Sequence, residues 1–450
     1  MMTLNRRALL GSSLALPFLQ AARSSPAQAQ DAPPPILFVH GNGDHAALWL
    51  TTLWRFEANG WPSANLLAVN MPDPLARADD AVPQPHRSSS AEQTERLTGF
   101  VAGLRARTGA PRVALIGNSR GGFPIRDFVV HGGGAAQVSH AITCGTPNRG
   151  VYDWEFSPGN EFNGRGPFLR RLNAGETDVI EGTAFLAIRS DNDLFAQPDG
   201  RFVNRPGTPT GITTDGPMLR GAANVLLPGL DHRETAYHWR SFREQFRFIA
   251  GREPDTLSVP PEPRVTLDGL VTGLEAGAAT NRPVAGATVE LFRVDPLTGA
   301  RQGEALHRRD TGADGAWGPV TVERGTFLEI VLAAPGHPVA HYFRTPFPRS
   351  TDVLHLRPPA ALAAADRESA ALVRLTRPRG YFGWPRDVVL LDGREVAERR
   401  EGIASIAVAN LRLPVMRLGS AVPALFNEES IVARAVPLSE NRISIAEMTW

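Results

Sequence analysis

The chain has little cysteine, little net charge and no long apolar run, and each shortage excludes a class of protein. Cys144 is the single cysteine among 450 residues, which excludes a disulfide within the chain and a zinc site built from cysteines. We expect it to be a small buried side chain. The formal net charge of +1 argues against a general role in binding nucleic acid or anionic surfaces. No apolar run is long enough for a membrane-spanning helix, so we expect no transmembrane segment.

The first 29 residues have the composition of an export signal. Arg6-Arg7 precedes an apolar run at residues 14–19, and Ala27-Gln28-Ala29 offers a cleavage site of small residues. This pattern is similar to a twin-arginine signal peptide, with an ordinary Sec signal or a basic amphipathic tail as the alternatives. We therefore expect residues 1–29 to be a signal peptide and the mature protein to be exported, to the periplasm or the medium.

Short apolar runs alternate with helical patterns over residues 30–251, the expected catalytic domain. Ser89 and Glu92 form a capping box at the start of one helix. This alternation predicts the α/β class, with a mostly parallel sheet covered by helices on both faces. The predicted strands are 36–39, 66–69, 113–116, 138–143, 184–188 and 224–227, and two further helices are predicted at 123–130 and 236–249.

The alternation fails between Asn148 and Gly182, where aromatic residues such as Trp154 and Phe162 stand among glycines without a clean period. A connection of this length inside a domain usually has a function. We predict a cap or lid at about 148–182 over an apolar pocket. An irregular surface loop whose aromatic rings pack down is an equal alternative.

The composition changes after residue 251. Four prolines at 252–263 predict a linker, and short alternating strands with turn signals predict all-β domains beyond it. We expect a β-sandwich at 264–358 and a second β region, sandwich or barrel, at 359–450. Neither has a polar cluster suited to catalysis, so a covering or binding role is expected. The predicted strands are 289–291, 327–332, 371–375, 387–391, 403–408 and 442–445, with a hairpin turn at Asp392-Gly393.

The strongest motif in the sequence is Gly117-Asn118-Ser119-Arg120-Gly121. An apolar strand precedes it and an apolar-periodic helix follows, which is the strand–turn–helix context of a G-x-S-x-G nucleophile. The small residues two before and two after the serine let the backbones approach, and the helix N-terminus favours negative charge near the serine. The context predicts that Ser119 is a catalytic nucleophile rather than a chance serine in a β–α turn.

A serine hydroxyl needs a histidine base within hydrogen-bond reach. His232 follows the strand predicted at 224–227, on the sheet edge that the serine occupies, and is the best candidate. His238 falls inside a predicted helix, and His40 precedes the serine in the chain. We therefore expect structural roles for these two histidines.

The base in turn needs a carboxylate to orient it. Asp191 and Asp193 both follow the strand predicted at 184–188. Asp193 lies farther past the strand, where the chain should cross toward the histidine, so it is preferred and Asp191 is the runner-up. The order Ser119, Asp193, His232 suits this fold. With Asp199, the two aspartates could instead bind calcium, although the glycine and terminal glutamate of a calcium loop are lacking.

Acyl transfer also needs donors for the oxyanion of its tetrahedral intermediate. One should be the backbone N–H of Arg120, the residue after the nucleophile. The other should come from the turn after the first strand, most simply the N–H of Asn42. His40-Gly41 would shape that turn.

Three motifs in the first half, at residues 40–41, 117–121 and 145–148, resemble those of the α/β-hydrolase superfamily. In the archaeal relative that the chain resembles, the catalytic acid follows the strand after the elbow helix. Thr143-Cys144-Gly145 holds that place here, without a carboxylate. The acid must then come from a later strand, as Asp193 does, or from Asp153 in the excursion.

The second half resembles a different set of proteins. Residues 325–330 and 338–347 look like the C-terminal β domain of a group of archaeal and bacterial lipases, and residues 281–289 resemble carboxypeptidase-regulatory-like sandwiches. In those lipases a small hydrolase domain carries a β-barrel region that helps to bind long-chain lipid. The resemblance implies a serine lipase or esterase, with Ser119 and His232 in the catalytic roles and no transferable acyl-chain specificity.

Together these observations predict an exported serine carboxylester hydrolase that cleaves apolar esters through an acyl-enzyme, without a cofactor or metal. Its expected partner is a small-molecule or lipid ester, with contact to a lipid or polymer surface through the C-terminal β regions. A polyester depolymerase with the same triad is one alternative. The other is a non-catalytic protein that binds lipid or glycan, against which the combination of serine, histidine and oxyanion turn argues.

Overall fold

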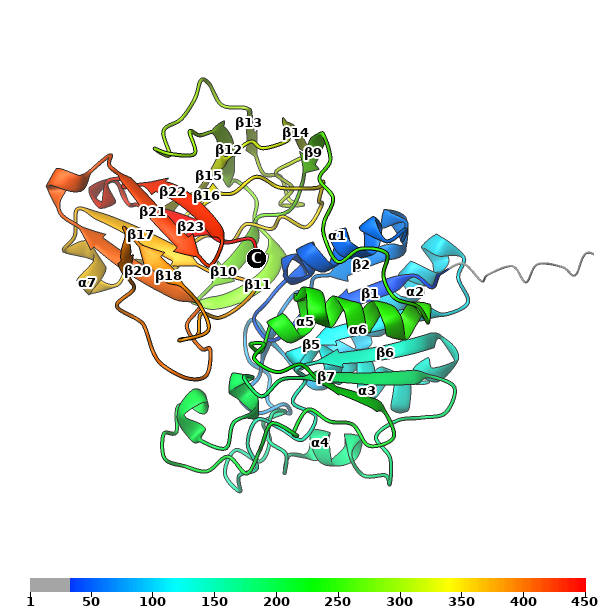
Figure 1. The fold of residues 1–450 in the computed structure, drawn as a ribbon. Helices are drawn as coiled ribbons and strands as arrows, with labels where there is room; N and C mark the ends of the chain where they lie inside the picture. Colours follow the sequence, from blue (N-terminus) through cyan, green and yellow to red (C-terminus); the bar gives the residue numbers. More distant parts are fainter. Residues whose placement is uncertain (1–32) are drawn as a thin grey trace, which may run out of the picture. The chain divides into compact units, whose positions relative to one another are not determined.

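The computed structural model of the protein describes residues 33–450. The predicted signal peptide at 1–29 lies outside these residues and stays a prediction. Along the described chain, a parallel sheet with helices comes first and a region rich in antiparallel strands follows (Figure 1).

Six strands of the first half form one sheet in the order β2-β1-β5-β6-β7-β8. They are β1 (Ile36–Val39), β2 (Leu66–Val69), β5 (Val113–Asn118), β6 (Val138–Cys144), β7 (Ala184–Arg189) and β8 (Ala223–Leu226). All neighbouring pairs are parallel. The chain runs outward from β1 to β2 and then continues on the other side with β5, so the strand order reverses between β1 and β5. Sheets of this kind bind ligands at the carboxyl edge near such a reversal.

Two layers of helices cover this sheet. The longer helices are α1 (Leu50–Ala58), α2 (Ser90–Thr108), α3 (Gly122–Val130) and α6 (Trp239–Ala250). Successive side chains of β1 point to opposite faces. Leu37 and Val39 pack in one cluster with side chains of α2 and α3. Ile36 and Phe38 pack in another with side chains of α1 and α6. The predicted fold class, a mostly parallel sheet between helices, is confirmed.

The starts of two helices show how the local sequence determines where a helix begins. Ser89 Oγ accepts a hydrogen bond from the backbone N–H of Glu92 (3.2 Å), and the Glu92 carboxylate accepts one from the N–H of Ser89 (2.8 Å), as the capping box predicts. The prediction of one continuous helix at 236–249 is wrong. His238 has an extended backbone (φ −58°, ψ 149°) between α5 (Glu234–Tyr237) and α6, and its Nδ1 accepts from the N–H of Arg240 (3.2 Å). A capping side chain thus starts a new helix there.

The C-terminal half is rich in β-sheet, as predicted. A seven-stranded sheet has the order β13-β12-β15-β16-β23-β17-β20, and a four-stranded sheet has the order β19-β18-β21-β22. Because β16 and β17 both pair in parallel with β23, the sheet crosses the boundary expected at residue 358. The strands are β12 (Thr288–Arg293), β13 (His307–Asp310), β15 (Leu328–Ala333), β16 (Val339–Arg344), β17 (Ala371–Thr376), β18 (Val389–Leu391), β19 (Arg394–Glu395), β20 (Val408–Leu413), β21 (Ala421–Phe426), β22 (Glu429–Arg434) and β23 (Arg442–Glu447).

Smaller elements complete the described chain. Two-stranded pairs are formed by β3 (Leu75–Ala76) with β4 (Arg87–Ser88), β9 (Arg264–Leu267) with β14 (Val320–Glu323), and β10 (Thr272–Glu275) with β11 (Ala278–Pro283). Asp392 and Gly393, both with positive φ, form the predicted hairpin turn between β18 and β19. A short helix, α7 (Ala364–Arg367), lies near the start of the second predicted β region.

The strand predicted at 403–408 is wrong, because regular pairing begins only at Val408, opposite Thr376, and Ile406 forms only an isolated bridge with Phe382. The residues before it serve a contact with the first half instead. The N–H of Ala404 donates to the Asn192 side chain (3.1 Å). The alternating pattern of residues 403–408 therefore does not reflect a regular strand.

The two halves share one apolar core. A single cluster of buried side chains includes residues of β1, α1 and α6 together with residues of β9, β12, β15 and β23. Trp54 of α1 shows how the halves meet. Its indole N–H donates to the carbonyl of Ser350 (2.8 Å), and its ring lies 6.4 Å from that of Phe347 and 6.3 Å from that of Trp450. The C-terminal half therefore covers apolar surface of the first half.

The excursion at 148–182 contains one short helix, α4 (Pro167–Leu172), and packs against α3. The ring of Phe168 lies 5.4 Å from that of Phe123 in an edge-on contact. The rings of Trp154 and Phe156 stack at 4.7 Å, and the side chain of Phe156 is 42% exposed. Some aromatic rings thus pack down while another faces solvent, and the role of the segment as a cap or lid stays a prediction.

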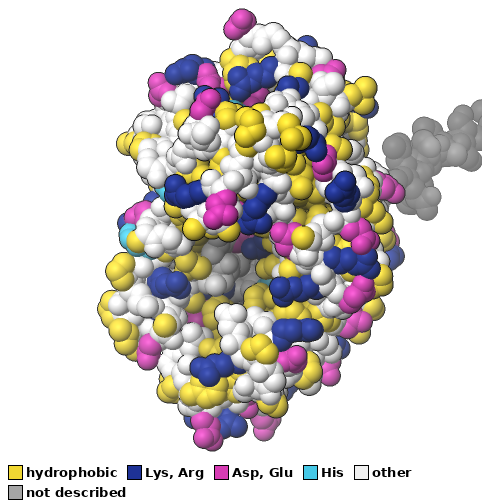
Figure 2. Space-filling model, turned by 90° about the vertical axis from the view of Figure 1, so that its left-hand side faces the viewer, with side chains coloured by type: hydrophobic (Ala, Val, Ile, Leu, Met, Phe, Trp, Pro, Cys, Tyr) yellow, Lys and Arg dark blue, Asp and Glu magenta, His cyan; other side chains and the backbone are white. Residues whose placement is uncertain are grey.

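Charges of both signs are mixed over the face drawn in Figure 2, where basic side chains gather around a central hollow. All 47 basic side chains of the protein are arginine, since the sequence contains no lysine. Arginine presents five N–H donors in a fixed planar fork, which makes it the better cation for buried ion pairs. Within residues 33–450, none of the helices has the length and apolar character needed to cross a membrane.

Candidate catalytic site

Ser119 follows β5 directly, at the reversal of strand order. Its φ of +53° lies in the left-handed region, which is strained for a residue with a Cβ and is found mostly at functional sites. The tight turn depends on glycines. A Cβ on Gly117 would lie 2.6 Å from the carbonyl oxygen of Gly121, and a Cβ on Gly121 would lie 2.5 Å from that of Val39. The motif predicted from the sequence thus has the steric basis expected of it.

The structure brings His232 and Asp193 together. The Nδ1 atom of His232 lies 2.8 Å from Oδ1 of Asp193, and their side chains are 3% and 1% exposed. Asp193 follows β7 and caps a short turn, because its Oδ1 also accepts from the N–H of Phe195 (2.9 Å). The Phe195 ring contacts the imidazole edge-on at 4.7 Å. The pair is therefore held in one orientation from two sides.

The loop with His232 is joined to the turn with Ser119. Asn118, the residue before the serine, donates from Nδ2 to the carbonyls of Cys144 (3.0 Å) and His232 (3.3 Å). Gly145 lies close to both His232 and Asp193, where a side chain would not fit. A Cβ at Gly145 would lie 3.0 Å from the carbonyl oxygen of His232 and 3.1 Å from Oδ2 of Asp193. These contacts gather the three predicted triad residues at the carboxyl ends of β5, β7 and β8.

The other candidate acids lie elsewhere. Asp191 is exposed, and its Oδ1 accepts from the N–H of Gly229 (2.7 Å). Asp153 pairs with Arg165 (3.0 Å), and its side chain is 41% exposed. Asp199 accepts from a backbone N–H in its own turn. In the part of the chain that the structure describes, no group of three or more His, Cys, Asp or Glu side chains could hold a metal ion.

The turn after β1 lies against Ser119. A Cβ on Gly41 would come within 2.9 Å of the Ser119 Cβ. Asn42, the predicted second oxyanion donor, accepts from the N–H of Ala76 through its side chain (2.8 Å). His40 is structural, as expected. Its Nε2 accepts from the N–H of Met71 (3.0 Å), and burial lowers its pKa to about 4, so the ring is neutral near pH 7.

One further site feature, the pairing of Arg120 with Glu161, carried no signal in the sequence. The side chain of Arg120, whose backbone N–H is the first predicted oxyanion donor, forms a buried two-pronged ion pair with Glu161 (2.5 and 2.8 Å). This pair ties the excursion to the nucleophile turn. Burial lowers the pKa of His238 to about 4, in keeping with its place as a helix cap.

The turn after β1 is also bound from the C-terminal half. Asn281 Nδ2 donates to the carbonyls of Asp44 (2.8 Å) and Met71 (2.9 Å). Arg357 donates to the carbonyl of Gly43 (3.1 Å) and to Oδ1 of Asn281 (2.7 Å). Residues more than 200 positions apart therefore shape this turn together, which local sequence patterns could not reveal.

Comparison with known protein families identifies part of the chain. Residues 263–361 match the lipase C-terminal domain family. The predicted resemblance to a lipase C-terminal domain is thereby confirmed for these residues, which follow the parallel sheet and its G-x-S-x-G turn. No curated protein sequence matches the chain.

Solved structures with some similarity to the chain include lipases. Mature Bacillus licheniformis lipase BlEst2 is 19% identical, covers 48% of this chain and 90% of its own, and has a TM-score of 0.35. Its propeptide form is 13% identical, covers 90% and 94%, and has a TM-score of 0.36. A Paleococcus ferrophilus monoacylglycerol lipase is 12% identical, covers 49% and 96%, and has a TM-score of 0.34.

Proposed function

We propose that the protein is an exported serine hydrolase of carboxylic esters, of the lipase or esterase type. The observation that carries the proposal is the buried His232–Asp193 pair, whose loop is joined through Asn118 to the strained G-x-S-x-G turn of Ser119. In this proposal Ser119 is the nucleophile, His232 the general base and Asp193 the residue that orients the base.

In the first half-reaction, Ser119 Oγ attacks the ester carbonyl and its proton passes to Nε2 of His232. Oδ1 of Asp193 accepts a hydrogen bond from Nδ1–H of His232, which leaves Nε2 free to take the serine proton and stabilises the imidazolium that forms. The imidazolium then gives its proton to the leaving alcohol, and the acyl group stays on Ser119. In the second half-reaction water attacks this acyl-enzyme with the same base, which releases the acid and the free serine.

The backbone N–H groups of Asn42 and Arg120 are the proposed donors to the oxyanion. Support comes from the closeness of Gly41 to Ser119 and from the place of Arg120 at the start of the turn into α3. The buried pair of Arg120 with Glu161 fixes the residue whose N–H is needed. Donors held in place before reaction stabilise developing charge without reorganising, which is often the largest single contribution to catalysis.

The C-terminal half is proposed to contact a lipid or polymer surface. Val415 and Met416, on a short turn after β20, are 73% and 87% exposed. Adjacent apolar side chains on a soluble surface are typical of interaction sites. The export signal at 1–29 would place the enzyme where such surfaces are met.

Turnover of p-nitrophenyl esters of graded chain length tests the proposed function. Wild-type protein should hydrolyse them, and Ser119→Ala and His232→Ala should each lose several orders of magnitude in kcat while remaining folded. Hydrolysis of p-nitrophenyl butyrate by Ser119→Ala at the wild-type rate would mean that the mechanism is wrong.

A further inference from the structure

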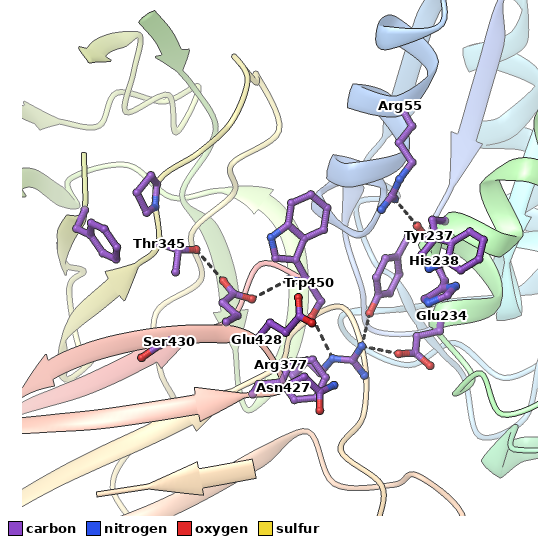
Figure 3. Close-up of a pocket in the computed structure, with 15 residues that line it drawn as sticks. Arg55, Glu234, Tyr237, His238, Thr345, Arg377, Asn427, Glu428, Ser430 and Trp450 are labelled. Carbon is purple, nitrogen blue, oxygen red and sulfur yellow. Dashed lines mark hydrogen bonds and ion pairs between the residues drawn. The ribbon is translucent and has the colours of Figure 1, made fainter. Parts of the chain in front are cut away.

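The loop that carries His232 is held by an arginine from the C-terminal half. Arg377 follows β17 and is 3% exposed. Its NH1 donates to Oδ2 of Asp231 (2.7 Å), and its NH2 donates to Oε1 of Glu234 (2.5 Å). Figure 3 shows Arg377 reaching from the C-terminal strands toward Glu234 and Tyr237. The residues that flank His232 are thus bound by a side chain that lies 146 positions beyond Asp231.

Every donor of this guanidinium has an acceptor. Beyond the two carboxylates, NH1 donates to the carbonyl of Tyr381 (2.8 Å), NH2 to the hydroxyl of Tyr237 (3.0 Å) and Nε to the carbonyl of Trp450 (3.2 Å). Five N–H groups therefore meet five acceptors. Gly380 leaves room for the guanidinium of Arg377, because a Cβ at position 380 would lie 2.4 Å from its NH1 atom. The side chain is locked in one position.

The two carboxylates close a tight loop around His232. Oδ1 of Asp231 accepts from the N–H groups of Arg233 (2.8 Å) and Glu234 (2.9 Å), and Oε2 of Glu234 accepts from the N–H of Asp231 (2.7 Å). Two buried carboxylates this close repel each other unless cations compensate them. Arg377 and Arg386 supply that compensation, with NH1 of Arg386 2.7 Å from Oε2 of Glu234.

Charge balance at this loop follows from the same contacts. Burial alone would raise the pKa of Glu234, but the charges of Arg377 and Arg386 outweigh it and lower the pKa to about 2. Burial and the charge of Glu234 raise the pKa of Asp231. The two arginines therefore keep at least one full negative charge stable beside His232.

We propose that Arg377 is a positioning residue for His232, which it holds through Asp231 and Glu234, so that the C-terminal half completes the catalytic site. This inference rests on the proposed function. It gives the C-terminal half a role in bond breaking through the histidine, in addition to any role in surface contact. Arg377 touches neither substrate nor the reacting atoms.

Loss of Arg377 would have two separable effects. The loop would relax, which moves the base away from its working geometry. The net charge near His232 would also become more negative, which favours the imidazolium. The charged and titratable groups facing this loop are Asp193, Asp231, Arg233, Glu234, Tyr237, His238, Asp44, Arg377, Tyr381, Arg386 and Asp387.

The test compares Arg377→Met with Arg377→Lys in the full-length protein, using pH profiles of kcat/KM on a soluble p-nitrophenyl ester. Arg377→Met should lose about 10- to 100-fold in kcat, because small displacements of a catalytic base cost this much. The acid limb of its kcat/KM profile should move to higher pH by about 0.5 to 1 unit, because one positive charge near the His232 imidazole has been removed. Arg377→Lys keeps the charge but not the fork, so it should lose kcat with the acid limb in place.

Arg349→Met is the matched control. Arg349 also joins the halves, through Glu57 of α1 (3.4 Å), but it does not contact the His232 loop. It should leave both kcat and the acid limb unchanged. If Arg377→Met does not fold, Arg386→Met replaces it, since that side chain is 26% exposed and binds the same Glu234. The expected changes are in the same direction and smaller.

A folded Arg377→Met protein with wild-type kcat and an unmoved acid limb would overturn the inference. So would an equal upward shift of the acid limb in Arg377→Lys, because charge would then not be its cause. These outcomes leave the proposed function intact as long as Ser119→Ala is inactive. Failure of the proposed function is seen separately, as full activity in Ser119→Ala.

Discussion

The Nδ1 atom of His232 lies 2.8 Å from Oδ1 of Asp193, and almost no part of either side chain is exposed. The two residues stand 39 positions apart, in loops after adjacent parallel strands. A buried carboxylate on an imidazole fixes its tautomer, so the free Nε2 becomes the acceptor. This relationship underlies the first prediction.

Asp193→Asn should lower kcat on a soluble ester by about 10³- to 10⁴-fold, since an amide in that place can favour the wrong tautomer. Asp191→Asn and Asp153→Asn should change kcat by much less, because both carboxylates lie away from the imidazole. The measurement is steady-state kinetics on the three variants, with melting temperatures alongside. A larger loss in Asp191→Asn or Asp153→Asn than in Asp193→Asn would move the acid to that residue.

The glycine at position 121 should not tolerate a side chain. A Cβ there would lie 2.5 Å from the carbonyl oxygen of Val39, so Gly121→Ala must displace the nucleophile turn. We expect a loss of more than about 2 kcal/mol in the free energy of unfolding and a loss of ester hydrolysis. Gly103→Ala is the control, because Gly103 lies within α2 with nothing near its missing Cβ. It should gain about 0.5–1 kcal/mol. Equal stability of the two variants in urea unfolding would contradict the steric argument.

His40 should make the fold sensitive to acid. Its pKa is lowered to about 4 by burial, against 6.5 when unfolded, so its contribution is fully present above pH 6.5 and is lost as the pH falls toward 4. Between pH 7.5 and 5.0 it accounts for about 2 kcal/mol of lost stability. His40→Gln keeps a hydrogen-bonding side chain without this titration. Urea unfolding at both pH values should show the wild type losing about 2 kcal/mol more than the variant. The same loss in both proteins would refute the assignment.

The exposed side chains of Val415 and Met416 should affect hydrolysis only when the ester is presented at a lipid surface. Val415→Ser together with Met416→Ser should reduce hydrolysis of an emulsified long-chain ester and leave p-nitrophenyl butyrate hydrolysis unchanged, since less apolar area is available to bury in the interface. Leu297→Ser is the matched control, because that side chain is 82% exposed but stands alone on another loop. Equal activity of the double variant and the control on the emulsion would exclude these residues from surface contact.

The parts that depend on local pattern could be predicted from the sequence. The strand–turn–helix around Ser119 is set by four apolar residues and the glycines that follow, all within a dozen positions. The alternating apolar runs predicted the parallel sheet, and the place of Asp193 past β7 predicted its contact with His232. In each case the determining residues lie near one another in the chain.

The rest depends on contacts between distant residues. The helix predicted at 236–249 breaks because His238 caps α6, which periodicity does not reveal. The residues before Val408 alternate like a strand but bind Asn192 of the other half. Arg377 carried no signal, because it acts on carboxylates more than 140 positions away.

The shared core changes how the C-terminal half must be studied. If the β regions were separable, a cut after residue 249 would be expected to leave the parallel sheet folded, with the proposed activity on short-chain esters. In the structure, that cut would expose the core around Trp54 and remove Arg377 from the His232 loop. Single substitutions in the full-length protein therefore separate surface binding from catalysis more cleanly than truncation does.

Covalent labelling of Ser119 tests the central claim most directly. A p-nitrophenyl alkylphosphonate reacts with an activated serine and remains bound as a stable adduct, so it reports the nucleophile without knowledge of the natural ester. Mass spectrometry of the digested protein should find one adduct, on the peptide that contains Ser119, with ester hydrolysis lost in proportion and no adduct in Ser119→Ala. Ester hydrolysis by a protein whose Ser119 stays unlabelled under these conditions, or inactivation through an adduct at another residue, would contradict the account.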